Sequence, residues 1–324
     1  MDDELSVLVS LDFPSLYLKK IQDVSSGVKV QATSDTKELL TLIGDADVLL
    51  AGVFSRELFL AAKRLKWIQS LFAGVDRLLL PEVVQSKVTL TNASGVNSTA
   101  VSEHAIGLML ALSRKFHFFV RNQIENRWKT SDVELLTQME ELSGKTVGIV
   151  GLGRIGGEIA RKAKCLGMTV LATRRNLSAP KPEHVDRLVP TEHRKQLLAD
   201  SDFVVLALPL TKDTEKMIGE AELKSMKNTS YLINVSRGKL VEEEKLVQAL
   251  NEGWIAGAGL DAFEVEPLLR DSPLWQMKNV IITPHVAGLT PYYLDRLTDL
   301  FCDNLSHFLR GESLINVVDK KLGY

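Results

Sequence analysis

Cysteine is nearly absent from this sequence, and no long apolar run occurs in it. The only two cysteines, Cys165 and Cys302, lie far apart and outside any metal-ligand spacing. This argues against a disulfide scaffold and against a cysteine-based metal centre, and it favours a reducing compartment such as the cytoplasm. The apolar run at 105–112 is much shorter than the roughly 18 residues that a membrane span requires. The acidic residues 2–4 stand where a secretory signal would be basic.

The chain also lacks an excess of charge of either sign. It contains 39 Lys and Arg against 41 Asp and Glu, so its formal net charge is -2. We therefore expect neither nucleic acid nor an anionic membrane as a partner. Apolar residues make up 45% of the chain and charged residues 25%, which is ordinary for a globular protein. The length of 324 residues exceeds what one compact core usually holds, so two domains are expected.

Two tracts of short apolar strands alternate with amphipathic helices. In the first tract, strands are predicted near Leu5–Ser10, Val28–Val30, Asp47–Ala51, Trp67–Phe72 and Val88–Thr91. In the second, they are predicted at Thr146–Val150, Thr169–Thr173, Phe203–Leu208, Tyr231–Val235, Ala256–Leu260 and Val280–Thr283. Strands that alternate with helices form parallel sheets covered on both faces. The pattern therefore predicts an α/β protein with two doubly wound parallel sheets.

Two longer helical patterns set the expected domain boundaries. One runs from about Ser98 to Val120 with apolar residues three or four apart, and we interpret it as the first crossing between domains. The other, Asp295–Leu309, is expected to return and pack on the first domain. Residues 1–97 plus 290–324 are therefore predicted to form one domain, which binds substrate, and residues 98–289 a dinucleotide-binding domain.

A glycine fingerprint follows the first strand of the second tract. Gly151, Gly153 and Gly156, with Arg154 and Ile155 between them, stand after a strand and before a helix. The first glycine allows a tight turn, the second lets a pyrophosphate approach the backbone, and the third lets helix and strand pack closely. The phosphates would lie at the helix N-terminus, which favours anions. Such a spacing is a weak signal alone, but its setting between strand and helix makes it specific.

The end of the next strand carries arginines where an NAD site needs an acid. A carboxylate about 20 residues after the glycines would accept the ribose hydroxyls of NAD. Here Thr173 is followed by Arg174 and Arg175, whose guanidinium groups suit the 2′-phosphate of NADP. The alternative is that both arginines belong to a solvated loop. NADP is the preferred prediction, with NAD as the other cofactor considered.

Three later strand ends each deliver polar side chains that a buried strand does not need. Arg237 follows one strand, Asp261 and Glu266 follow the next, and His285 follows the last. Ligands of doubly wound sheets bind at the carboxyl ends of the strands, so these residues should lie near the nicotinamide.

Arginine, glutamate and histidine suit hydride transfer coupled to proton transfer. Arg237 offers a forked cation for the carboxylate of an oxo acid. His285 can give or take a proton near neutral pH, and a neighbouring Glu266 would orient it. Taken singly, each residue is more often a surface ion pair or a structural histidine. We interpret the remaining histidines as structural: His104, His117, His184, His193 and His307.

These motifs resemble the D-isomer-specific 2-hydroxyacid dehydrogenase family over essentially the whole chain. The matching segments are GLGRIG at 151–156, NVSRG at 234–238, LDAFEVEP at 260–267 and TPHVAG at 283–288. The resemblance implies a Rossmann-like cofactor domain inserted in a flavodoxin-like split substrate domain. It assigns substrate binding to Arg237, acid–base catalysis to His285 and support of that histidine to Glu266.

The resemblance implies further contacts and a partner. It assigns the substrate carboxylate to the loop of Ala73, Gly74 and Val75, and it adds Thr173, Pro209, Val235 and Asp261 to the cofactor contacts. Relatives are usually homodimers, for which Phe116, Phe118, Phe119 and Trp128 offer an apolar surface; an ordinary core stripe is the equal alternative.

Three functions follow from this interpretation, in order of preference. The first is reduction of a small 2-oxo acid, such as glyoxylate or hydroxypyruvate, by NADPH. The second is NAD-linked oxidation of a hydroxy acid, as in phosphoglycerate dehydrogenases. The third is a non-catalytic, nucleotide-sensing protein of the co-repressor type.

Overall fold

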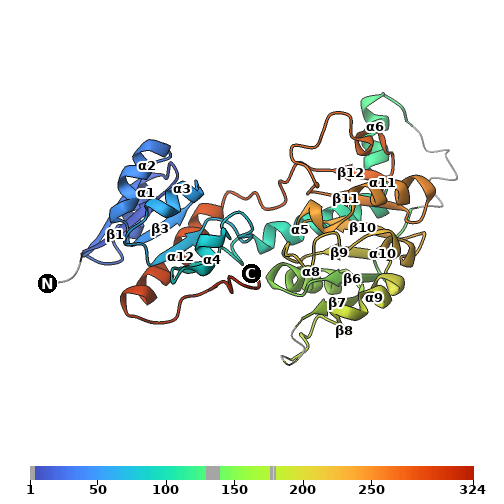
Figure 1. Ribbon diagram of the computed structural model, residues 1–324. Helices are drawn as coiled ribbons and strands as arrows, with labels where there is room; N and C mark the ends of the chain where they lie inside the picture. The colour runs from blue at the N-terminus through green and yellow to red at the C-terminus, as the bar shows by residue number, and fades with distance from the viewer. Residues whose placement is uncertain (1–3, 129–138, 176–177, 179) are drawn as a thin grey trace. The chain divides into compact units, whose positions relative to one another are not determined.

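The computed structural model of the protein describes residues 4–128, 139–175, 178 and 180–324. The chain divides into two compact units (Figure 1). Unit 1 consists of Met1–Asn97 with Thr290–Tyr324, and unit 2 consists of Ser98–Leu289. No helix of the described part is long and apolar enough to cross a membrane.

Unit 1 is built on a parallel sheet of five strands in the order β2-β1-β3-β4-β5. This is the flavodoxin-like order of a doubly wound sheet. Its strands are β1 Leu5–Val9, β2 Val28–Ala32, β3 Val48–Ala51, β4 Trp67–Ser70 and β5 Thr89–Thr91. Its helices are α1 Ser15–Gln22, α2 Thr36–Leu42, η1 Ile43–Asp45, α3 Arg56–Ala61, α4 Pro81–Gln85 and α12 Tyr293–Leu309.

Alternating strand residues give unit 1 two cores. Val7, Val9 and Trp67 face α1 and α12, where Trp67 stacks on Phe301 of α12 at 5.0 Å between ring centroids. Leu8 lies in the other core, which also contains side chains of α2 and α3. The C-terminal helix is therefore an integral part of the unit that the N-terminal strands begin.

Unit 2 is built on a parallel sheet of seven strands in the order β12-β11-β10-β9-β6-β7-β8. Its first six strands in chain order follow the Rossmann pattern, and the seventh extends one edge. The strands are β6 Thr146–Val150, β7 Thr169–Arg174, β8 Arg187–Pro190, β9 Phe203–Leu206, β10 Tyr231–Asn234, β11 Gly257–Leu260 and β12 Val280–Ile282. The helices are α5 Ser98–Ser113, α6 Phe116–Ile124, α8 Arg154–Cys165, η2 Thr191–His193, α9 Arg194–Asp200, α10 Glu220–Ser225, η3 Gly238–Leu240, α11 Glu243–Glu252 and η4 Pro273–Gln276.

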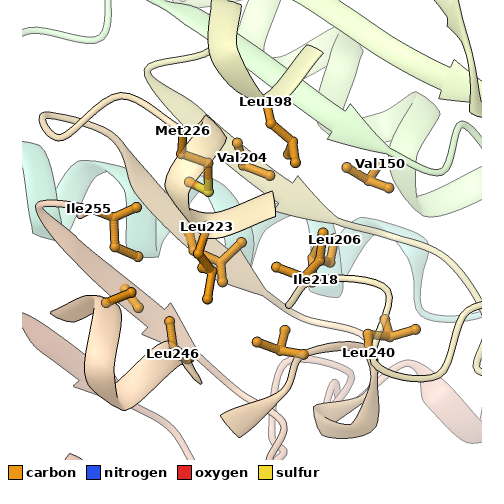
Figure 2. Packing of buried hydrophobic residues seen from close by; sticks show 14 of the residues in the cluster. Val150, Leu198, Val204, Leu206, Ile218, Leu223, Met226, Leu240, Leu246 and Ile255 are labelled. Atoms are coloured by element: carbon orange, nitrogen blue, oxygen red, sulfur yellow. The ribbon is translucent and has the colours of Figure 1, made fainter. Parts of the chain in front are cut away.

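Helices cover both faces of this sheet, so its central strands bury the side chains of both faces. Leu198, Leu223 and other side chains of α9 to α11 lie over Val204 and Leu206 of β9 (Figure 2). The alternate β9 residues, Phe203 and Val205, face α5 and α8. Every residue of β9 is thus buried, and the predicted fold class of two doubly wound parallel sheets is confirmed.

Two details of the predicted elements are wrong. The helix expected from Ser98 to Val120 is two helices, because Lys115 adopts a left-handed backbone with φ 57° between α5 and α6. The Nζ of Lys115 donates a hydrogen bond to the Tyr231 hydroxyl at 2.9 Å, a tertiary contact that holds it there. The short strand β8 at the sheet edge was not predicted.

Candidate active site

The glycine loop joins β6 to α8 with the geometry that a dinucleotide needs. Gly151 has φ 102°, and a Cβ there would lie 2.6 Å from the Ala207 carbonyl oxygen of the neighbouring strand end. A Cβ on Gly156 would lie 2.1 Å from the Gly151 oxygen, whereas one on Gly153 would meet nothing within 4 Å. The loop is therefore tightly packed against neighbouring backbone at its first and third glycines, and the space beside its second glycine is open. This fits a pyrophosphate resting on the N-terminus of α8.

Thr173 holds this loop from the adjacent strand. It is buried, its Oγ1 accepts a hydrogen bond from the Gly151 N–H at 3.1 Å, and its carbonyl accepts one from the Leu152 N–H at 2.9 Å. The residue expected among the cofactor contacts therefore shapes the loop.

The two arginines that follow Thr173 are placed differently from each other. Arg174 is half-buried, and its Nη1 donates to the Pro180 carbonyl at 3.3 Å. Arg175 is exposed, with its Nη2 3.8 Å from the Asp213 carboxylate. Asp213 lies in the loop after β9 that begins near Pro209, so this loop and the end of β7 lie side by side.

Gly156 and Gly157 form a matched pair for testing the loop. Gly156→Ala should weaken dinucleotide binding by tenfold or more and destabilise unit 2 by about 1–3 kcal/mol, because its Cβ displaces the Gly151 carbonyl. Gly157→Ala places its Cβ in open space on the same helix and should be neutral or up to about 1 kcal/mol stabilising. Fluorescence titration with the reduced dinucleotide measures the binding of both variants, and thermal melts measure their stability. Equal behaviour of the two variants would contradict the close packing.

The register of β10, β11 and β12 places the acid–base residues at one sheet edge. Asn234 pairs with Leu260 and Leu260 with Ile282, so all three strands end at the same level. Arg237 follows the first of these ends, and its carbonyl accepts a hydrogen bond from the Asn234 side chain at 2.9 Å. Buried Val235 lies between them in the core against α5.

The decisive contact joins His285 and Glu266. The Nδ1 of His285 lies 2.8 Å from Glu266 Oε2. The other carboxylate oxygen, Oε1, accepts the backbone N–H of Phe263 at 3.0 Å, which fixes the direction of the carboxylate. Because Nδ1 is committed to Glu266, Nε2 is the nitrogen available to a ligand. The His285 side chain is 45% exposed and can therefore reach one.

Asp261 is buried and holds the turn that carries His285. Its Oδ1 accepts hydrogen bonds from the Thr283 hydroxyl at 2.6 Å and the Val286 N–H at 2.9 Å. Its Oδ2 accepts the Ala287 N–H at 2.9 Å. The Thr283 hydroxyl also lies 2.9 Å from Nε2 of His104. Thr283 was not singled out from the sequence, and His104 was interpreted there as a structural histidine, because an isolated histidine on a helix carries no distinguishing signal.

The loop expected to bind a carboxylate lies in unit 1. The Phe72 carbonyl accepts hydrogen bonds from the Ser70 hydroxyl and the Ala93 N–H, which anchor the start of the loop. Within this unit, no described residue accepts a hydrogen bond from the N–H groups of Ala73, Gly74 or Val75. Three consecutive N–H donors of this kind suit an anion. No group of three or more His, Cys, Asp or Glu side chains able to hold a metal occurs among the residues described.

Comparison with known proteins decides the family. Residues 106–287 match the family model described as "D-isomer specific 2-hydroxyacid dehydrogenase, NAD binding domain". The chain belongs to the D-isomer-specific 2-hydroxyacid dehydrogenase family. It is an NAD(P)-dependent enzyme that transfers a hydride between a nicotinamide cofactor and C2 of a 2-hydroxy acid or 2-oxo acid. The predicted family and reaction class are confirmed, and neither alternative, NAD-linked oxidation of a hydroxy acid or a co-repressor-like protein, is favoured.

Individual relatives match over nearly the whole chain. A glyoxylate reductase of Korarchaeum cryptofilum is 35% identical over 323 residues, 98% of this chain and 96% of the relative. One from Pyrococcus furiosus is 38% identical over 297 residues, 88% of this chain and 86% of the relative. Among solved structures, an NADPH-dependent glyoxylate/hydroxypyruvate reductase from Sinorhizobium meliloti, in complex with NADP and sulfate, has a TM-score of 0.85. It is 28% identical, and the match covers 99% of this chain and all of that one.

Proposed function

We propose that this 2-hydroxyacid dehydrogenase works as a reductase of small 2-oxo acids, with NADPH as its preferred cofactor and glyoxylate and hydroxypyruvate as its first candidate substrates. The observation that carries the proposal is the His285–Glu266 pair at 2.8 Å, placed at the same sheet edge as Arg237. The names of the archaeal and rhizobial relatives support the reductive direction.

His285 is the proposed proton donor. When bound, the nicotinamide cofactor supplies the hydride that adds to C2 of the oxo acid. Nε2 of His285 gives a proton to the carbonyl oxygen as charge develops on it, while Glu266 holds Nδ1 and fixes the orientation of the ring. In the reverse direction the same nitrogen accepts the hydroxyl proton.

Each unit offers one group that is proposed to bind a carboxylate. Arg237 presents a guanidinium, which matches a carboxylate or the neighbouring carbonyl oxygen in bidentate fashion. The N–H groups of Ala73, Gly74 and Val75 form the second anion-binding element.

An assay of NADPH oxidation over a panel of 2-oxo acids tests the proposal. We expect turnover with glyoxylate and hydroxypyruvate and markedly lower kcat/KM with branched or aromatic oxo acids. Protein that is folded and binds NADPH, yet turns over no member of the panel, would refute the proposed function.

The preference for NADPH is proposed from Arg174 and Arg175. No carboxylate follows β7 to bind the ribose hydroxyls, and a guanidinium bonded to a phosphate contributes about 1.5–3 kcal/mol, or roughly 10–150-fold. Arg174→Asp should therefore lower the ratio of kcat/KM for NADPH over NADH by about that factor. Arg310→Asp, in an exposed ion pair of unit 1, is the matched control. Equal efficiency of the wild-type enzyme with both cofactors would overturn the preference.

A homodimer is proposed through the exposed apolar face of α6. Phe116, Val120 and Ile124 are spaced four residues apart and are 55%, 52% and 75% exposed, and Trp128 follows at 92%. For Phe116 and Trp128, the interpretation as a core stripe is therefore wrong, and Phe118 and Phe119 are half-buried. Light scattering should give twice the 35.9 kDa of the chain, and Ile124→Glu should halve that mass. Leu16→Glu on α1, an equally exposed position, should not change it.

The cytoplasm is the proposed location of the enzyme. Both cysteines are free thiols, as a reducing compartment maintains them. Cell fractionation with an NADPH-dependent glyoxylate reductase assay tests this placement.

A further inference from the structure

A chain of hydrogen bonds runs from α5 to the turn that carries His285. Nε2 of His104, on α5, lies 2.9 Å from the Thr283 hydroxyl, and that hydroxyl lies 2.6 Å from Asp261 Oδ1. His104 Nε2 is itself 3.7 Å from the same carboxylate oxygen. The three side chains come from a helix and two strand ends that are distant in sequence and packed together inside unit 2.

Counting the protons along these hydrogen bonds shows which ring nitrogen of His104 carries a hydrogen. A carboxylate only accepts hydrogen bonds, so the single proton of the Thr283 hydroxyl is donated to Asp261. The hydroxyl oxygen can then only accept from His104. Nε2 of His104 therefore carries a hydrogen and donates it.

The Asp261 carboxylate needs this support because it fixes a strained turn. His285 has φ 55°, a left-handed backbone that a residue with a side chain adopts only when its surroundings impose it. Asp261 is 2% exposed and accepts hydrogen bonds from residues on both sides of His285, from Thr283 before it and from Val286 and Ala287 after it. The direction of the His285 ring depends on these hydrogen bonds.

We propose that His104 is a positioning residue for proton transfer, which acts through Thr283 and Asp261 to hold His285 in its reactive orientation. The inference rests on the proton-donor role of His285 proposed above. With His104 in place, the Thr283 hydroxyl has one orientation, and both oxygens of Asp261 remain committed to the turn. Without its donor, the hydroxyl can rotate away, and on the N-terminal side of His285 the turn keeps only the hydrogen bond from the Thr283 N–H to the Leu260 carbonyl at 2.9 Å.

The expected effect is on chemistry and not on cofactor binding. A displacement of about 1 Å at a reacting group can cost on the order of 10²-fold in rate. We expect His104→Leu to lower kcat by roughly 10–10²-fold per NADPH-binding site, titrated by fluorescence, and to raise the solvent deuterium isotope effect on kcat. His104→Gln, whose amide can donate from the same distance, should restore kcat to within about threefold of wild type. His193→Leu, an exposed histidine on η2, is the control.

A double-mutant cycle separates positioning from a general structural role. Thr283→Val removes the same link, so the double variant His104→Leu/Thr283→Val should be no slower than the slower single variant. A merely structural role would lower the melting temperature and the number of NADPH sites, yet leave the isotope effect per site unchanged. The proposal is overturned if His104→Leu turns over like wild type per site, if His104→Gln is as slow as His104→Leu, or if the two losses multiply.

The tautomer gives a readout that is independent of activity. Nitrogen-15 NMR of the imidazoles should show hydrogen on Nε2 of His104, assigned by comparison with His104→Gln. A ring with hydrogen only on Nδ1 would refute the hydrogen-bond chain even in an active enzyme. A protein that shows this tautomer but reduces no 2-oxo acid would refute the proposed function. The proposed role of the hydrogen-bonded residues His104, Thr283 and Asp261 in proton transfer would then be refuted as well.

Discussion

Replacing His285 by alanine should lower kcat/KM for glyoxylate reduction by about 10²–10⁴-fold, the usual contribution of a positioned acid or base. The reason is that Nδ1 of His285 is bound to Glu266, so Nε2 is the nitrogen available to donate a proton. No other group of the His285–Glu266 pair can replace Nε2 in this role. Steady-state rates with NADPH measure the loss. Fluorescence titration should show that NADPH affinity changes by no more than about threefold, because the glycine loop lies on another strand.

Glu266→Gln provides a graded comparison for this prediction. The amide oxygen can still accept the Nδ1 hydrogen, but the negative charge beside the ring is lost. We expect a smaller loss of kcat/KM than in His285→Ala. His307→Ala, in unit 1, should leave kcat unchanged. If His285→Ala retained a tenth or more of wild-type activity, another group would have to be the proton donor.

Gly238→Ala should be the most damaging small substitution in the sheet edge that carries Arg237. Its Cβ would lie 1.8 Å from the Phe263 carbonyl carbon, 2.0 Å from the Phe263 oxygen and 2.3 Å from the Glu264 nitrogen. All three are backbone atoms, so relief requires the segment after β11 to move away from the segment after β10. We expect a loss at the upper end of the roughly 1–3 kcal/mol typical of overpacking. Catalysis should also fail, because the two segments carry Arg237 and Glu266.

Thermal melts and kinetics separate the two consequences. A loss of about 3 kcal/mol lowers the melting temperature by roughly 6–12 °C in a domain of this size, so the variant remains folded for assay below that range. Gly219→Ala is the control, since its Cβ would lie 3.3 Å from the end of the flexible Glu242 side chain. A melting temperature and kcat/KM like those of wild type would show that the two backbones do not approach as closely as the structure has them.

The sequence predicted those elements whose signal is local and apolar. Inner strands such as β3, β9 and β10 are buried on both faces, so they appear as short apolar runs, and polar residues that follow such runs mark the sheet edge. Strand β8 was missed because Arg187–Pro190 begins with an arginine, ends with a proline and lies at the edge of the sheet. The break at Lys115 was missed because no glycine or proline marks it in the sequence.

The same limit applies to the site. Arg237, Glu266 and His285 could be predicted because each follows a strand and bears a group with evident chemistry, and their roles stay predictions that the variants above test. His104 could not be separated from the other histidines, since its meaning comes from Thr283 and Asp261, which approach only in the folded sheet.

The two-part composition of unit 1 constrains how the polypeptide folds during synthesis. The strands β1 to β5 leave the ribosome first, but the core that contains Trp67 stays open until α12 supplies Phe301. At about 5–20 residues per second, the roughly 200 intervening residues take on the order of 10–40 s to make. Unit 2 is continuous in the chain, so it completes its core while the earlier segment still exposes apolar surface. The nascent chain therefore needs protection at its beginning for longer than at its middle, and chaperone dependence should concentrate in the first hundred residues.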